Sequence, residues 1–308
     1  MTYISVIIPT TRIGGLDVLF AGLQQQTFKD FELVLVDSLY NRRKDIVSEQ
    51  AVKYSFPVKH VLQRQNTASS YCAAMNTGVI NASGQIIFCI CDYAWLYPDC
   101  LQIHANFHQS NKSYGLICSY NVCKLPKLHK NFYRSYGGHI PYDTEHNRKR
   151  FIAQERENHD SYIEDINSGK LDSLMWSIFD DPFSSNATRS LELIATKDPY
   201  PEGNVGVDCC YLKNESYELD NVLDINGFNE VLDGSHGWQD WEFAERFIAN
   251  GSKLYYKPHM TATVVDPRSV LFGRLRERDV FSNEAIWKSA KGSNKPVNNW
   301  SLKEARKL

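Results

Sequence analysis

The sequence predicts an α/β fold in which a mostly parallel sheet is flanked by helices. Two observations lead to this prediction. Short β-branched apolar runs alternate with segments of helical spacing from the N-terminus to Val122, and polar residues follow several of these runs where a strand would end. Alternating strands and helices build parallel sheets because each crossover helix packs back onto the sheet. Ligands of such sheets bind at the carboxyl ends of the strands.

The individual elements follow from residue spacing and from end signals. Leu16, Leu19, Phe20 and Leu23 have the spacing of an amphipathic helix, and Asn250-Gly251 is a helix stop signal. The expected strands are residues 4–8, 31–36, 58–62, 85–90 and 115–122. The expected helices are residues 16–26, 44–54, 69–79, 98–109 and 238–248.

Size and composition limit the function classes. The 308 residues are 43% hydrophobic, which suits one large domain with a real core, and the net charge of −2 argues against a general nucleic-acid binder. No apolar run has the length of a membrane span, and the N-terminus lacks the basic segment of a signal peptide. The eight cysteines have no paired CxxC spacing. We therefore expect a cytoplasmic protein with buried thiols.

The alternating rhythm is lost between residues 124 and 202, where polar, charged and aromatic residues cluster. We interpret this segment as an insertion or lid over the strand ends. Helical patterning returns in the last forty or so residues, and we expect a C-terminal helical extension at 268–308.

Acidic residues follow two of the predicted strands. Asp37 ends the second strand and Asp92 follows the strand at 85–90, while Pro9-Thr-Thr11 ends the first. At one sheet edge these residues would converge, and a strand-end carboxylate can hold a sugar hydroxyl or a divalent cation. Taken alone, Asp37 is better explained as a turn or N-cap residue, and Asp92 is explained at least as well as the residue that ends its strand.

A third carboxylate opens a helix after a Gly-rich loop. Asp240 and Glu242 lie two residues apart at the start of the helix at 238–248, so one can face a crevice while the other faces solvent. The helix dipole holds such a carboxylate ionised, as a general base requires. Helix N-terminal charge stabilisation alone explains either residue. His104 and His108 have helical ligand spacing but no third ligand nearby, which favours a solvated helix face.

Taken together, the motifs resemble a family 2 glycosyltransferase with the Rossmann-like GT-A fold, over residues 3–122 and 203–266. Their order and spacing agree across several separate blocks. The matching motifs are Ile4-Ser-Val-Ile-Ile-Pro9, Leu23-Gln-Gln-Gln-Thr-Phe28, Phe31-Glu-Leu-Val-Leu-Val-Asp37, Asn76-Thr-Gly78, Ala82-Ser-Gly-Gln-Ile-Ile87, Gly203-Asn204, Ile225-Asn-Gly-Phe-Asn-Glu230 and Gly237-Trp-Gln-Asp240.

The resemblance implies an inverting transferase, of the hexosyl or a related type, that uses a nucleotide-sugar donor, with a UDP-sugar favoured, and a glycan or other hydroxyl acceptor. Asp240 would be the catalytic base, and Mn²⁺ or Mg²⁺ would be held by Asp92 and Asp266. The implied donor-binding residues are Pro9, Thr10, Thr11, Asp37, Asp92 and Tyr93. The implied acceptor-binding residues are Trp238, Gln239 and Trp241.

The resemblance also implies a domain division. Residues 1–267 would form the GT-A domain, with a nucleotide-sugar half at 1–122, the insertion at 124–202, and an acceptor and base half at 203–267. The chain departs from the family pattern where Cys91-Asp-Tyr93 replaces a richer acidic motif and Gln239 replaces the usual Glu. The thinned motif leaves open a catalytically degenerate module that binds a nucleotide sugar or glycan without turnover, which the intact Asp240 region disfavours.

Overall fold

The computed structural model describes residues 2–10, 16–38, 40–64, 70–92, 94–124, 192–194, 200–233, 237–265, 277–290 and 298–307. Most of the insertion or lid expected at 124–202 lies outside these residues. No helix within the described ranges has both the length and the apolar character needed to cross a bilayer.

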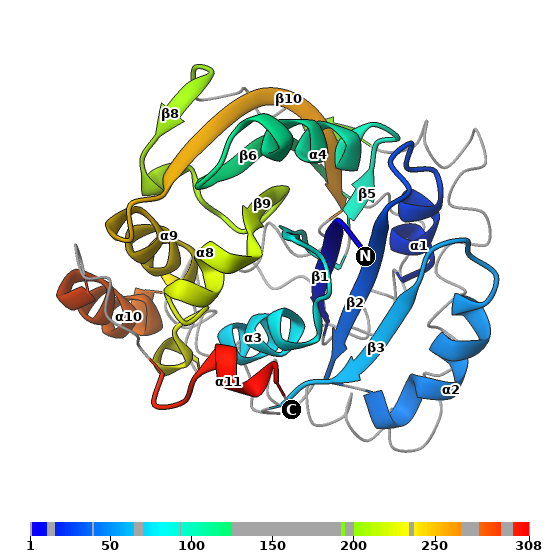
Figure 1. Ribbon diagram of the computed structural model, residues 1–308, viewed down its shortest axis with the longest axis horizontal. Coiled ribbons are helices and arrows are strands. Elements are labelled where there is room, and N and C mark those ends of the chain that lie inside the picture. Colours follow the sequence, from blue (N-terminus) through cyan, green and yellow to red (C-terminus); the bar gives the residue numbers. More distant parts are fainter. Residues whose placement is uncertain are drawn as a thin grey trace, which may run out of the picture.

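A mixed sheet forms the centre of the molecule, and its strand order is β3-β2-β1-β4-β9-β6-β10-β5, with β7 beside β6 and β8 beside β10 (Figure 1). The pairings make β1, β2, β3, β4, β6 and β10 run in the same direction, while β9 and β5 run against them. The strands are β1 (Ile4–Thr10), β2 (Phe31–Asp37), β3 (Val58–Leu62), β4 (Ile86–Cys89), β5 (Ala94–Leu96), β6 (Tyr114–Lys124), β7 (Glu192–Ile194), β8 (Gly203–Val205), β9 (Glu215–Glu218) and β10 (Lys253–Val265).

Helices cover both faces of this sheet, which confirms the predicted fold class. Alternate residues of β1 point to opposite faces, so Ile7 packs into one apolar core while Val6 and Ile8 pack into the other. The first core lies under α3, α8 and α9, and the second under α1, α2 and α4. The helices are α1 (Leu16–Gln24), α2 (Tyr40–Ala51), α3 (Tyr71–Asn81), α4 (Cys100–Ser110), α8 (Leu219–Asp224), α9 (Gln239–Ala249), α10 (Glu277–Ala290) and α11 (Leu302–Ala305).

Strand β9 was not among the elements expected from the sequence. It enters the sheet antiparallel between β4 and β6, with Glu215 opposite both Cys89 and Ile117. Its sequence, Glu-Ser-Tyr-Glu, has no apolar run, yet its first three residues are buried. The antiparallel direction places the first residue of β9 at the edge where the parallel strands end.

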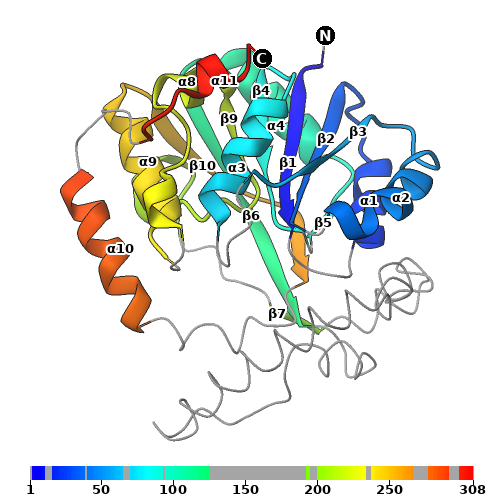
Figure 2. The same cartoon turned by 90° about the horizontal axis from the view of Figure 1, so that it is seen from below.

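The C-terminal helices pack against helices of the central sheet. Helix α10 lies beside α9, and α11 lies beside α3 (Figures 1 and 2). Leu302 belongs to the apolar core shared by α3 and α9 and contacts the tight turn at Gly227, whose φ of 69° favours glycine. A Cβ at Gly227 would lie 2.2 Å from a methyl of Leu302 and 2.4 Å from Asn76 Oδ1. The turn at Gly227 therefore packs closely against both α3 and α11.

Candidate active site

The ends of β1, β2 and β4 meet in a buried polar network. Thr10 Oγ1 donates a hydrogen bond to Asp92 Oδ2 at 2.9 Å. Arg43, in the first turn of α2, lies 3.4 Å from Thr10 Oγ1 through Nη2 and forms a bidentate ion pair with Asp37 at 2.5 and 2.6 Å. The structure thus brings together three of the residues singled out in the sequence, Thr10, Asp37 and Asp92, at one sheet edge.

Asp37 is a carboxylate of this network that its partners hold in the ionised form. It exposes no surface, and His60 on β3 also contacts it, with Nε2 2.8 Å from Oδ2. Burial by itself raises the pKa of Asp37, but the charge of Arg43 and the hydrogen bonds from His60 and Arg43 lower it below its ordinary value. Sequence reasoning missed both partners. The clue was the basic residue six positions after Asp37, because a buried carboxylate needs a cation.

The third carboxylate opens α9 as expected. Trp238, in the left-handed conformation with φ of 69°, precedes the helix, and Asp240 lies in its first turn with Oδ1 3.0 Å from the backbone N–H of Trp241. Asp240 is half-buried. Glu242 diverges from it, but toward the interior, where it forms a fully buried ion pair with Arg246 at 2.7 Å. The expectation that one of the two acids faces solvent is therefore wrong, because Arg246 and Asn229 hold Glu242 inside.

Helix α10 supports the loop that leads to Asp240. Trp287 of α10 stacks on Trp238 with ring centroids 4.5 Å apart, and Trp241 completes the aromatic cluster. Asn283 Nδ2 donates to the backbone oxygens of Leu232 and Gly237, at 3.2 and 2.9 Å. These two contacts hold both sides of the loop between residues 232 and 237.

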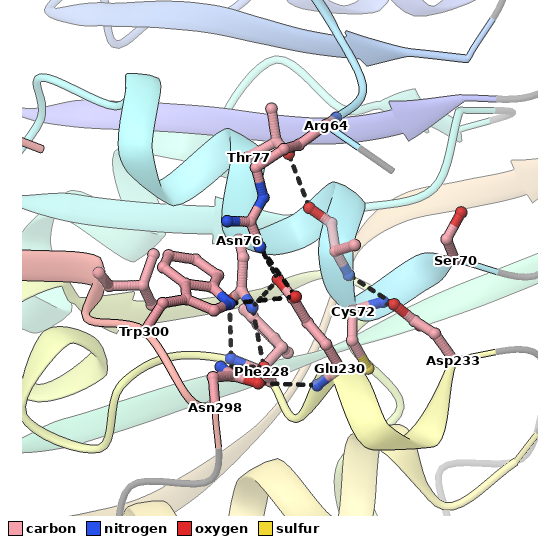
Figure 3. Close-up of polar contacts among 12 residues, drawn as sticks. Arg64, Ser70, Cys72, Asn76, Thr77, Phe228, Glu230, Asp233, Asn298 and Trp300 are labelled. Carbon is pink, nitrogen blue, oxygen red and sulfur yellow. Dashed lines mark hydrogen bonds and ion pairs between the residues drawn. The ribbon is translucent and has the colours of Figure 1, made fainter. Parts of the chain in front are cut away.

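The motif at 226–233 ties this loop to α3 and to the tail (Figure 3). Asn76 exchanges hydrogen bonds with the backbone of Phe228 and donates to Glu230. Glu230 also binds Arg64 at 2.6 Å and accepts from Trp300 Nε1 at 3.2 Å, while the Arg64 guanidinium lies 3.6 Å from the Trp300 ring centroid. The two carboxylate oxygens of Asp233 accept from the backbone N–H groups of Cys72 and Ala73 at the start of α3.

A fourth carboxylate, which the sequence did not suggest, lies at the same edge. Glu215 begins β9 and is fully buried. It pairs with Cys89 of β4, and Cys89 lies three residues before Asp92. Burial raises its pKa to about 7, and the nearby charge of Asp240 adds to the rise. No periodic or motif signal marked Glu215, because the polar strand that carries it does not resemble a buried strand.

Electrostatics connect the donor edge with the start of α9. Burial, the largest cause, raises the pKa of Tyr120 on β6, and the electrostatic effects of Glu215, Cys91 and Asp240 add to the rise. Asp240 and Cys91, the neighbour of Asp92, therefore act on the same side chain.

The described residues do not form a metal centre by themselves. The described ranges contain no cluster of three or more His, Cys, Asp or Glu side chains that could hold a metal ion. Asp92 offers a hard carboxylate oxygen at the strand end, where a cation would need diphosphate oxygens and water to complete its shell. Thr11, Tyr93 and Asp266 lie outside the described residues, so the expectations for them stay untested.

His104 and His108 do not lie on a solvated helix face. Both are fully buried on the side of α4 that faces β9, where Ser216 Oγ lies 2.6 Å from Nδ1 of His104 and 2.8 Å from Nε2 of His108. Burial lowers the pKa of His104 to about 3 and that of His108 to about 4. The expectation of a solvated face is wrong because Phe88, Ser216 and the polar strand β9 cover these imidazoles.

The mixed sheet with helices on both faces is the GT-A fold, which solved structures of glycosyltransferases share. The sequence matches glycosyl transferase family 2 over residues 5–166, and the chain belongs to that family. No curated protein matches it in sequence.

Solved structures share the fold at low sequence identity. S. aureus TarS superposes with a TM-score of 0.53 at 12% identity, covering 94% of this chain and 39% of TarS. Residues 1–349 of TarS in complex with UDP-GlcNAc give 0.53 at 11% identity, covering 86% of this chain and 59% of that one. GalNAc-T7 with UDP, GalNAc and Mn²⁺ gives 0.57 at 10% identity, covering 99% of this chain and 54% of that one. The chain thus spans less than two thirds of the length of these relatives.

Proposed function

We propose that the protein transfers a sugar from a UDP-sugar to an acceptor hydroxyl with inversion, with Asp240 as the general base. The observation that supports the proposal is the convergence of Thr10, Asp37 and Asp92 at one sheet edge in a family 2 chain, with Glu215, on which the charge of Asp240 acts, opposite Cys89. The structural relatives S. aureus TarS and GalNAc-T7 were solved with UDP or UDP-GlcNAc, which supports the choice of nucleotide.

In this proposal one side of the sheet edge binds the donor and the other side binds the acceptor. Pro9, Thr10 and Asp37 hold the nucleoside of the donor, together with Thr11 and Tyr93 as the sequence predicts. Trp238, Gln239 and Trp241 hold the acceptor beside Asp240. The insertion at 124–202 shapes the acceptor site in this domain division, and the extension at 268–308 supports it.

The chemical step is an in-line displacement. Asp240 takes the proton of the acceptor hydroxyl while that oxygen attacks the anomeric carbon from the face opposite the diphosphate. The bond between the anomeric carbon and the diphosphate breaks, and the diphosphate leaves with the bonding electrons. Attack from the opposite face inverts the anomeric configuration.

We also propose that a divalent cation, Mn²⁺ or Mg²⁺, binds with the donor at Asp92, and at Asp266 as the sequence suggests. A bound cation neutralises charge on the leaving diphosphate. The chain's own contribution is to hold the Asp92 carboxylate in place through the hydrogen bond from Thr10. GalNAc-T7, which was solved with Mn²⁺, shares the fold.

The test compares Asp240→Asn with the wild type. UDP release is measured from a panel of UDP-glucose, UDP-galactose, UDP-GlcNAc and UDP-GalNAc with Mn²⁺, and UDP binding is measured as a thermal shift. We expect Asp240→Asn to lower turnover by at least about 100-fold, because it removes the base, while the UDP-induced shift stays unchanged.

Glu245→Gln is the matched control, since Glu245 is a half-buried acid on the same helix. It is expected to keep wild-type turnover. Turnover of Asp240→Asn within about threefold of the wild type would show that Asp240 is not the base. Binding of UDP without turnover of any panel member by the wild type would favour a degenerate binding module instead.

A further inference from the structure

Glu215 lies beneath the helix that carries the proposed base. Side chains alternate along β9, so Glu215 and Tyr217 share one face while Ser216 points to the other, against His104 and His108. Tyr217 packs edge-on against Phe243 and Phe247 of α9, at 5.0 and 5.1 Å. The face of β9 that carries Glu215 is therefore the face that α9 covers, and the charge of Asp240 in the first turn of α9 acts on Glu215.

Among the described residues, only neutral groups hydrogen-bond to this buried carboxyl. Oε1 accepts from the backbone N–H groups of Tyr211 at 2.7 Å and Lys213 at 3.4 Å. Oε2 accepts from the Tyr217 hydroxyl at 2.5 Å and the Cys210 thiol at 3.2 Å. Within the described part of the chain, no lysine, arginine or histidine forms an ion pair with Glu215. This shell can accommodate either protonation state, and it lacks the fixed cation that would lock the ionised one.

The other titratable groups around Glu215 do not ionise near neutral pH. Its charge acts on the thiols of Cys89 on β4, Cys118 on β6, and Cys209 and Cys210 in the turn before β9, and burial raises the pKa of each thiol. A change of charge near pH 7 in this cluster therefore does not come from a thiol.

The phenols behave in the same way. Glu215 acts on Tyr71 of α3, Tyr120 of β6 and its own neighbour Tyr217, and burial raises the pKa of all three. Tyr211, whose backbone binds Glu215, also has a raised pKa through burial. Among the described residues, Asp240 is the remaining carboxylate whose charge acts on Glu215.

We propose that Glu215 is a positioning residue that sets the strength of Asp240 as a proton acceptor through its own charge state, an inference that rests on the proposed role of Asp240. Coupling between two sites is reciprocal, so the charge of Asp240 that disfavours ionisation of Glu215 implies an equal effect of ionised Glu215 on Asp240. When Glu215 loses its proton to solvent, Asp240 holds the acceptor proton more strongly and the hydroxyl becomes easier to deprotonate.

The test is the pH profile of UDP release from the most active UDP-sugar of the panel. For the wild type we expect turnover to rise by about threefold through a step near pH 7, the gain from a modest change in base strength. Glu215→Gln removes the charge but keeps an oxygen acceptor, and its profile is expected to lack the step and to stay at the lower level. A step of unchanged size and position in Glu215→Gln would overturn the inference.

Tyr217→Phe provides an independent variant should Glu215→Gln fail to fold. The Tyr217 hydroxyl stabilises the ionised form of Glu215, so its loss is expected to move the step to higher pH. A step that stays in place in Tyr217→Phe would also contradict the inference. Failure of the base role is separate, since it appears as retained turnover in Asp240→Asn, whatever the pH profile of the Glu215 variant.

Discussion

Asp37 and Glu215 are both fully buried carboxyls at the carboxyl edge of the same sheet, yet their electrostatics are opposite. Asp37 is ion-paired with Arg43 and contacted by His60, and its pKa is lowered below its ordinary value. Glu215 has neutral hydrogen-bond donors, and burial raises its pKa to about 7. Burial raises the pKa in both places, so the presence or absence of a cation decides which way each group shifts.

The ion-paired Asp37 and the neutrally hydrogen-bonded Glu215 suit different tasks at a reaction site. On the proposed donor side, Arg43 and His60 lower the pKa of the buried Asp37 carboxyl, so the geometry around Thr10 and Asp92 does not depend on a protonation change near neutral pH. On the proposed acceptor side, burial raises the pKa of the Glu215 carboxyl to about 7, and the charge of Asp240, the proposed base, adds to the rise. A permanent ion pair suits binding, and a titratable group suits control of proton transfer.

The strongest way to break the comparison is to remove the cation from the donor side. Arg43→Met leaves the Asp37 carboxylate buried without its main partner, and we expect the free energy of unfolding to fall by about 3–5 kcal/mol. Urea denaturation at pH 7.5 measures this loss.

The double variant Asp37→Asn with Arg43→Met is the matched control. It buries no charge at this place, so it is expected to recover most of the lost stability. It is not expected to recover the UDP-induced thermal shift, since Asp37 is proposed to bind the nucleoside. Equal instability of the single and double variants would mean that the lost packing of Arg43, rather than an unpaired charge, accounts for the effect.

The next prediction concerns the stability contributed by Glu215 as a function of pH. Its folded pKa is raised above the ordinary value of 4.5, so the folded state binds the extra proton between these two values. Its contribution to stability is fully present below about pH 4.5 and is lost as the pH rises to about 7, by about 3 kcal/mol in total.

Glu215→Gln removes this titration. The free energy of unfolding of the variant, relative to that of the wild type, is therefore expected to increase as the pH is raised from 5 to 8. The difference is read from urea denaturation of both proteins at several pH values. A difference that does not change with pH would contradict the raised pKa, and with it the contrast with Asp37.

The donor side of the fold was open to prediction from the sequence, and the reasons are physical. The strands that end at Thr10, Asp37 and Cys89 are continuous β-branched and aromatic runs buried on both faces, and such runs have few alternative structures. Once they are parallel neighbours, their polar end residues must share an edge. The helix that begins near Asp240 followed in the same way from its loop and its stop signal.

The partners of these residues were not open to prediction. Arg43 contacts Asp37 because α2 starts at Tyr40, four residues earlier than expected at 44, so a side chain assigned to a loop lies in the first turn of a helix. Glu215 is buried because β9 runs antiparallel between two parallel strands, a long-range pairing that leaves no periodicity in a four-residue polar strand. The tail at 298–307 packs against the core through two single residues, Trp300 and Leu302. No sequence pattern predicts these contacts.

The smallest expected effect compares the buried pair of Asp37 with the partly exposed pair of Arg64 and Glu230, whose side chains are 37% and 10% exposed. Trp300 covers this pair through its ring and donates to Glu230. Trp300→Phe keeps an aromatic ring but removes the N–H, and we expect a loss of about 1 kcal/mol, because solvent already weakens the charges at this place. The loss is measured by urea denaturation, with Trp300→Leu as the variant that also removes the ring. If the loss equals that of Arg43→Met, then exposure does not set the value of an ion pair in this protein, and the cation beside Asp37 matters for a reason other than its burial.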